Sequence, residues 1–156
     1  MADLDVTSSI DFDRGVLNVE VVVGTYQVTA EDIRAYARAI GETNPIYLDA
    51  EAARVGPYGT LVAPPLFIHT LRAQAGPDPK IRFGTTSFHA GERVQSFEPI
   101  RAGDTVTARA QITQVYAKTG RAGTMVFSVK RTTYTNQHGH TLITMETTMV
   151  RREMRR

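Results

Sequence analysis

Few side chains in this chain of 156 residues could do acid–base chemistry. Glu42 follows a helix-like apolar segment, where a glutamate is more often a solvated surface charge. It would act as a general base only if partial burial raised the pKa of its carboxyl group. Histidine is the other candidate proton carrier beside Glu42, because imidazole titrates near neutral pH. The chain has four histidines: His69, His89, His138 and His140.

These residue types do not predict a metal site or a common nucleophile motif. Only His138 and His140 are close in sequence, and no clustered carboxylates complete a ligand set, so we expect no bound metal. Cysteine is absent, which excludes disulfides, thiolate nucleophiles and zinc–thiolate sites. The G-x-S-x-G, P-loop and dinucleotide glycine patterns are also missing, which disfavours α/β-hydrolase, nucleotide triphosphatase and Rossmann chemistry.

A helix over residues 29–40 precedes Glu42. Thr29 can cap the N–H of Asp32, and Val28 and Ile33 are placed as a hydrophobic staple. Gly41 supplies the stop. Apolar residues recur inside this range at helical spacing: Ile33, Tyr36, Ala37 and Ile40.

Turn residues dominate the segment 42–64, which predicts a loop-rich excursion with one helical turn around residues 49–54. Binding residues are often carried on such loops. Within it, Gly59 would permit close approach of backbone or ligand. An apolar segment then runs from Pro64-Pro65 to Gly76-Pro77 and predicts a second, buried helix; its apolar members are Leu66, Phe67, Ile68, Leu71, Ala73 and Ala75.

The second half alternates apolar and polar residues between good turn sequences, which predicts three or four long antiparallel strands. The alternating residues are Val106, Ala108, Ala110 and Ile112, then Met125, Phe127 and Val129, then Ile143, Met145 and Met149. Two helices followed by such strands predict an α+β, hot-dog fold in which the sheet wraps the buried helix. With no repeat or linker, we expect a single domain over 1–156, with an N-terminal extension 1–25 and a basic C-terminal tail 151–156.

The charge distribution gives little sign of a macromolecular ligand. The formal net charge is +2, and the tail is interpreted as solvated, although it could attract a phosphate-bearing ligand such as coenzyme A. No aromatic interleaving accompanies it, so no nucleic-acid partner is expected. The acidic N-terminus lacks a secretory pattern, and no stretch approaches the roughly 20 apolar residues that span a bilayer. We therefore expect a cytoplasmic protein with no membrane partner.

Three strings in register resemble a known family. They are TAEDIRAYARAIGETNPIYLD, YGTLVAPPLF and FHAGERVQSFEPIRAGDTV. Together, from about Tyr26 to Arg151, they resemble the N-terminal type of MaoC-like dehydratase domain, found in fatty-acid-synthase-like dehydratases and in subunits of two-component hydratases. The resemblance implies a hot-dog fold, no cofactor, and an acyl-CoA or acyl-carrier thioester as ligand.

Active members of the wider family hydrate a trans-2-enoyl thioester, or dehydrate the (R)-3-hydroxyacyl thioester, with an Asp and a His in the loop pattern D-x-N-P-apolar-H. The chain matches this pattern at Asn44 and Pro45, but Glu42 stands at the Asp position and Tyr47 at the His position. A phenol with a pKa near 10 is a poor proton shuttle at neutral pH compared with an imidazole near 6.5. Tyr47 is expected to pack in the loop.

A further departure concerns the backbone. Active members begin the buried helix with His-Gly, and the glycine N–H resembles an oxyanion-hole donor. Here the pair is Pro64-Pro65, and proline has no N–H. Losing one such donor typically costs about 100-fold to 1,000-fold in turnover.

The resemblance therefore implies a degenerate catalytic site, at Glu42 and Tyr47, within a retained acyl cradle. Substrate-binding positions under this hypothesis are Asn44, Gly59, Pro64, Pro65, His69 and His89. His69 would lie near Pro65 in the apolar helix, where a satisfied buried histidine is the commoner outcome. His89 resembles a position often occupied by histidine in this subgroup.

The leading hypothesis is the non-catalytic, acyl-binding half of a heteromeric (R)-specific enoyl-CoA hydratase or 3-hydroxyacyl-thioester dehydratase, paired with a catalytic MaoC-like subunit. One alternative is an autonomous enzyme, either a hydratase using Glu42 with Tyr47 or His69, or a hot-dog thioesterase. Another is a non-enzymatic acyl-CoA-binding protein. A sheet edge that must be covered implies a dimer. The sequence leaves open whether it is a homodimer or a heterodimer, and which acyl group it takes.

Overall fold

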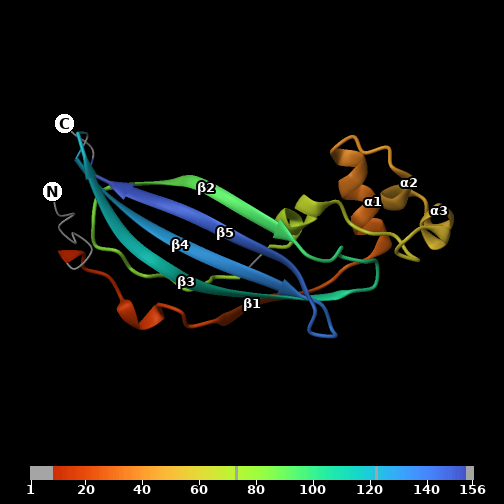
Figure 1. The fold of residues 1–156 in the computed structure, drawn as a ribbon, viewed down its shortest axis with the longest axis horizontal. Helices are drawn as coiled ribbons and strands as arrows, with labels where there is room; N and C mark the ends of the chain where they lie inside the picture. Colours follow the sequence, from red (N-terminus) through yellow and green to blue (C-terminus); the bar gives the residue numbers. More distant parts are fainter. Residues whose placement is uncertain (1–8, 73, 122, 154–156) are drawn as a thin grey trace.

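The structure, a computed structural model, describes residues 9–72, 74–121 and 123–153. Its strands form one five-stranded antiparallel sheet in the order β1-β3-β4-β5-β2. Figure 1 shows the α-helices gathered at one end of this long, twisted sheet. The elements are η2 (Arg14–Val16), β1 (Val21–Gln27), α1 (Ala30–Ala39), α2 (Pro45–Leu48), α3 (Ala50–Val55), η3 (Pro65–Thr70), β2 (Thr86–Ser96), β3 (Thr105–Gly120), β4 (Gly123–Thr135) and β5 (Thr141–Arg152).

The first helix forms as predicted. Thr29 caps α1: its side chain accepts from the Asp32 N–H at 3.1 Å, and the Asp32 carboxylate accepts from the Thr29 N–H at 3.1 Å. Ile33 and Ala37 of α1 are fully buried. The helical turn predicted around 49–54 is α3, whereas α2 was not predicted.

The prediction of a second helix reaching Ala75 is wrong in length. The segment forms only the six-residue 3₁₀ helix η3, which buries Phe67 and Ile68 and leaves Leu66 48% exposed. Beyond it the chain turns away and the Gln74 N–H donates to the Val23 carbonyl of β1 at 2.6 Å, so backbone pairing with a strand replaces the helix. Ala73 lies outside the described residues, as do Arg155 and Arg156 of the predicted tail.

The strand β1 was missed and falls largely in the predicted N-terminal extension. It pairs antiparallel with β3, from Val21 opposite Ala110 to Gln27 opposite Thr105, and forms one edge of the sheet. Its valine-rich sequence is typical of a strand. Residues before it also pack against the sheet: Ile10 and Phe12 are buried in a second cluster with Ile81, Ile112, Val115 and Val126.

One face of the sheet, here called the inner face, carries the main core. Val106 and Ala108 of β3, Tyr134 of β4 and Ile143 of β5 pack there against Phe67 and Ile68 of η3 and Ile33 of α1. The truncated η3 thus occupies the place of the predicted central helix and covers only part of the inner face. Among the described residues, no helix is long and apolar enough to cross a membrane.

Tyr134 makes this core less stable at alkaline pH. Only 3% of it is exposed, and burial, followed by Tyr26 and Glu92, raises the pKa of its phenol to about 12. In the unfolded chain the phenol ionises near pH 10. The stability contributed by the neutral phenol is therefore complete below pH 10 and is lost as the pH rises toward 12.

We expect the free energy of unfolding to fall by about 2 kcal/mol between pH 10 and 12 from this group alone. Urea denaturation of the wild type and of Tyr134→Phe, followed across that pH range, measures the effect. The variant should lose less stability on alkalinisation. An alkaline loss of equal size in both proteins would contradict this assignment.

Candidate functional site

A pocket of about 220 Å³ lies at the helix end of the sheet and contains three of the candidate residues: Tyr47, Pro64 and Pro65. Apolar groups from β5 and from the loop after β2 supply much of the rest of its wall. The complete lining is Ile46, Tyr47, Tyr58, Val62, Ala63, Pro64, Pro65, Ser96, Phe97, Glu98, Pro99, Ile100 and Ile143.

Backbone hydrogen bonds bring these distant segments together. The Val62 N–H donates to the Ile46 carbonyl at 3.2 Å, which fixes the prolines beside α2. The Ala63 N–H donates to the Ile100 carbonyl at 2.8 Å, which ties the same segment to the turn before β3. Because Phe67 is buried just beyond, Pro64 and Pro65 are held at the start of η3.

Tyr47 is held in its neutral form. Burial, followed by the negative charge of Glu42 and the neighbouring phenol of Tyr58, raises the pKa of Tyr47. A phenol whose pKa lies above its ordinary value near 10 accepts no proton from water at neutral pH. Tyr47 therefore supplies a wall and a hydroxyl to the pocket, and no base.

Removing the charge of Glu42 should lower the pKa of Tyr47. In Glu42→Gln the carboxylate no longer opposes formation of the phenolate, so the phenol should ionise at lower pH than in the wild type. The ultraviolet titration of each protein, minus that of its Tyr47→Phe counterpart, isolates this residue. The control Glu31→Gln on α1 removes an equal charge and should leave the pKa of Tyr47 unchanged. A shift of the same size in both variants would contradict the assignment of this effect to Glu42.

The start of η3 offers no backbone donor at its first two positions. Pro64 is the N-cap residue and Pro65 the first helical residue, and neither has an N–H. The first free amides of a helix are what usually bind an anion or a developing oxyanion. These two positions therefore cannot stabilise negative charge on a carbonyl oxygen placed beside them.

Comparison with known proteins fits this geometry. Residues 17–145 match the model of the FAS1-like dehydratase domain region. The chain belongs to this family. A UPF0336 protein of Thermobifida fusca is 34% identical over 125 residues, which are 77% of this chain and 82% of the relative.

Solved structures confirm the hot-dog fold of this FAS1-like dehydratase domain. A MaoC-like dehydratase of Rhodospirillum rubrum superposes with a TM-score of 0.68 at 18% identity, covering 90% of this chain and 94% of the other. The HadBC complex of Mycobacterium tuberculosis, a 3R-hydroxyacyl-ACP dehydratase, superposes with a TM-score of 0.66 at 25% identity, covering 86% of this chain and 96% of the other.

Two predicted binding residues shape the FAS1-like dehydratase domain near the pocket without lining it. Asn44 caps α2, because its Oδ1 accepts from the Ile46 N–H at 3.2 Å, and so sets the position of Tyr47. Gly59 has a φ of +70° in an exposed loop, a conformation that favours glycine. Its predicted role in binding stays a prediction.

The two histidines among the predicted residues lie away from this pocket. His69 lies in the last turn of η3, and its Nε2 lies 3.1 Å from Oε1 of Glu92 on β2. His89 is exposed on β2 opposite Met149, next to a register shift. The structure thus brings Tyr47 and the prolines together and separates them from the histidines. In the described part of the chain, no cluster of His, Asp and Glu could hold a metal ion.

Glu98 is a pocket residue that the sequence analysis missed. It stands in the turn after β2, and its carboxylate oxygens lie 3.7 Å from Nη1 of Arg101 and 3.6 Å from Nδ1 of His140. The spacing along the chain gives no sign that Glu98 lines the same pocket as Tyr47, since only the fold brings the two segments together. The string FHAGERVQSFEPIRAGDTV, which contains Glu98, was the feature of the sequence that could have pointed to it.

Proposed function

We propose that the chain is the acyl-thioester-binding, non-catalytic half of a heteromeric (R)-specific enoyl-CoA hydratase or 3-hydroxyacyl-thioester dehydratase. One observation carries the proposal: the pocket joins Tyr47, whose pKa is raised, to Pro64 and Pro65, which have no N–H. The site keeps a cavity for an acyl group, carries a phenol where the resemblance expects an imidazole, and lacks the first oxyanion donors.

The reaction explains what such a half lacks and what it supplies. Adding water across an enoyl thioester requires one group to take a proton from water and another to return a proton to the substrate. In this pocket Glu98 is the carboxylate, and its oxygens lie 3.7 Å from Nη1 of Arg101 and 3.6 Å from Nδ1 of His140. The chain supplies apolar walls from Tyr58, Phe97 and Ile100, and the partner supplies the proton-transfer groups.

Dimerisation would occur through a sheet edge. Among the described strands β2 pairs only with β5, so its other side offers a row of backbone N–H and C=O groups along eleven residues, Thr86–Ser96. The similar HadBC structure is a dehydratase complex. We propose a heterodimer with a catalytic MaoC-like subunit in the cytoplasm, with an acyl-CoA or acyl-carrier thioester as ligand.

A mixing experiment tests this function. Hydration of crotonyl-CoA and of a longer trans-2-enoyl-CoA is measured for the chain, for the MaoC-like subunit encoded nearest to it, and for the two together. The mixture should exceed the sum of the separate rates, most clearly with the longer substrate. A mixture that only equals the sum, while the chain still binds the saturated acyl-CoA, would instead favour a non-enzymatic acyl-CoA-binding protein.

The contact between His69 and Glu92 favours a second candidate, an autonomous hydratase. A carboxylate 3.1 Å from Nε2 orients an imidazole, as in many acid–base sites. His69→Gln separates the two candidates. If His69 is the base, the chain alone turns over substrate and the His69→Gln variant does not. If the chain is the non-catalytic half, neither protein shows turnover on its own.

A further inference from the structure

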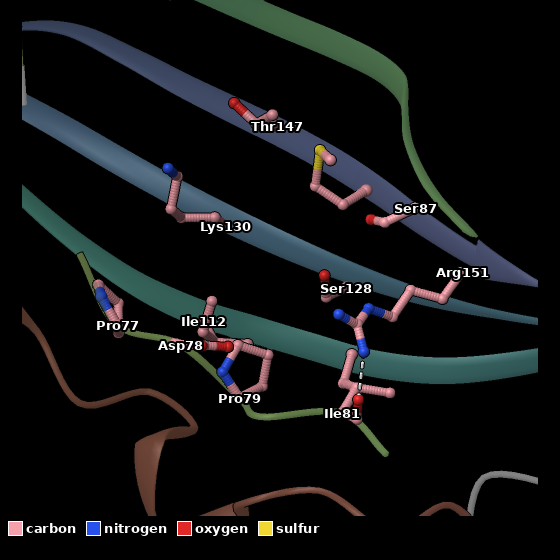
Figure 2. Close-up of a pocket in the computed structure, with 11 residues that line it drawn as sticks. Pro77, Asp78, Pro79, Ile81, Ser87, Ile112, Ser128, Lys130, Thr147 and Arg151 are labelled. Carbon is pink, nitrogen blue, oxygen red and sulfur yellow. Dashed lines mark hydrogen bonds between the residues drawn. The ribbon is translucent and has the colours of Figure 1, made fainter. Parts of the chain in front are cut away.

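A second pocket, of about 270 Å³, lies on the inner face between β3, β4, β5 and the segment 77–81 (Figure 2). None of its lining residues belongs to the pocket of Tyr47. Its lining is Pro77, Asp78, Pro79, Ile81, Ser87, Ile112, Ser128, Lys130, Thr147, Met149 and Arg151.

The sheet register places a lysine at the centre of this wall. Lys130 of β4 lies directly opposite Thr147 of β5 on one side and Ile112 of β3 on the other. The next inner-face residue of β4 is Ser128, opposite Met149. Side chains directly opposite on one face lie about 5 Å apart at Cβ, so Thr147 lies beside Lys130, and Ser128 follows two residues along β4 on the same face.

The ammonium group of Lys130 has no partner in the described part of the chain. Within the described residues, the ammonium group makes no hydrogen bond or ion pair, and the hydroxyls of Ser128 and Thr147 make no hydrogen bond. All three groups are accessible to solvent. Lys130 is nevertheless half-buried. A charge that loses part of its hydration without gaining a partner opposes folding, and a bound anion would offset that cost.

Arg151 of β5 adds a second positive charge to the pocket. Arg151 donates through Nη1 to the carbonyl of Ile81, which holds the segment 77–81 over the sheet (Figure 2). Asp78 is the acidic residue of the lining, and its Oδ1 already accepts from the Lys80 N–H at 2.9 Å. Two cations and one acid leave the pocket with a net positive charge.

The remaining walls are apolar, and the volume limits the ligand. Pro77, Pro79, Ile81, Ile112 and Met149 face the same space. A volume of 270 Å³ corresponds to about nine water molecules at roughly 30 Å³ each, so it accommodates a molecule of about nine non-hydrogen atoms. The fitting ligand has one anionic end and a short apolar stem.

We propose that this pocket binds the carboxylate of a small aliphatic acid, with Lys130 as its charge partner, Thr147 and Ser128 as hydroxyl donors, and the apolar wall around its stem. The proposal stands on this pocket alone and does not depend on the function proposed for the site at Tyr47. A charge-assisted hydrogen bond to a partly buried carboxylate contributes enough to change affinity about ten- to hundred-fold.

Titration calorimetry of the full chain with hexanoate tests the proposal, with hexanamide as the neutral probe of equal length and inorganic phosphate as the anion without a stem. Hexanoate should bind at least about ten-fold more tightly than either. Lys130→Met should weaken hexanoate binding to the level of hexanamide. Lys118→Met, which removes an exposed lysine of β3 that lies over the ring of Tyr116, should leave it unchanged.

Hexanoate affinity that survives in Lys130→Met would place the acid elsewhere and overturn the proposal, as would equal affinity for phosphate. If Lys130→Met does not fold, the isosteric Thr147→Val replaces it, because loss of one hydroxyl donor should weaken hexanoate binding several-fold and leave hexanamide less affected. An unchanged ratio of the two affinities in Thr147→Val would then overturn the assignment.

Discussion

Phe67→Ala is expected to lower the free energy of unfolding by about 3–5 kcal/mol. Phe67 is 2% exposed in the main core, and its ring meets Tyr36 of α1 edge-on at a centroid distance of 5.7 Å. Truncation removes these contacts and leaves a cavity between η3, α1 and the sheet. Urea denaturation of the wild type and the variant measures the loss.

The adjacent residue provides the matched control. Leu66 is 48% exposed on the same 3₁₀ helix, so Leu66→Ala should cost less than about 1 kcal/mol. Similar losses in the two variants would contradict the orientation of η3. Since η3 begins at Pro65, a loosened Phe67 should also weaken binding of saturated acyl-CoA at the pocket of Tyr47.

The second large effect is a gain of turnover in Tyr47→His with Pro65→Gly. The imidazole supplies a base that titrates near neutral pH, and the glycine supplies an N–H at the start of η3. Each contribution is typically worth about 100-fold or more. We therefore expect hydration of crotonyl-CoA by the double variant to exceed that of the unmodified chain by at least about 100-fold.

The control combines Tyr47→His with Pro57→Gly, which adds the same backbone freedom in an exposed loop and no donor at η3. The double variant should exceed this control by about 100-fold as well. Equal rates would mean that the missing N–H does not limit the reaction, and would remove the main argument for a degenerate site. Each rate is read from the absorbance of the enoyl thioester.

Local signals predicted much of the fold. The cap at Thr29 and the spacing of Ile33 and Ala37 specify α1 within the chain segment itself, and the alternation in 105–152 specifies three strands in the same way. The length of the second helix depends on tertiary structure. A wholly apolar segment favours a helix only if the core surrounds it, and here Leu66 faces outward while the Gln74 N–H pairs with β1.

The candidate site was predictable only where its residues share a motif. Tyr47 and the two prolines were found from the resemblance, and the structure places them in one pocket. Lys130 was missed because its surroundings come from strand register, and Glu98 because its pocket joins loops that are far apart in sequence. A lysine in an alternating strand gives no sign that it stands unpaired on the inner face.

The most direct test of the central claim is the hydration of crotonyl-CoA by the purified chain alone, from about pH 6 to 9, alongside Glu42→Ala. A chain whose pocket carries a phenol in place of an imidazole and lacks the first two backbone donors should show no rate above that of buffer, in either protein and at any pH. A rate from the unmodified chain that disappears in Glu42→Ala would contradict the account and establish this loop as a working variant of the catalytic site.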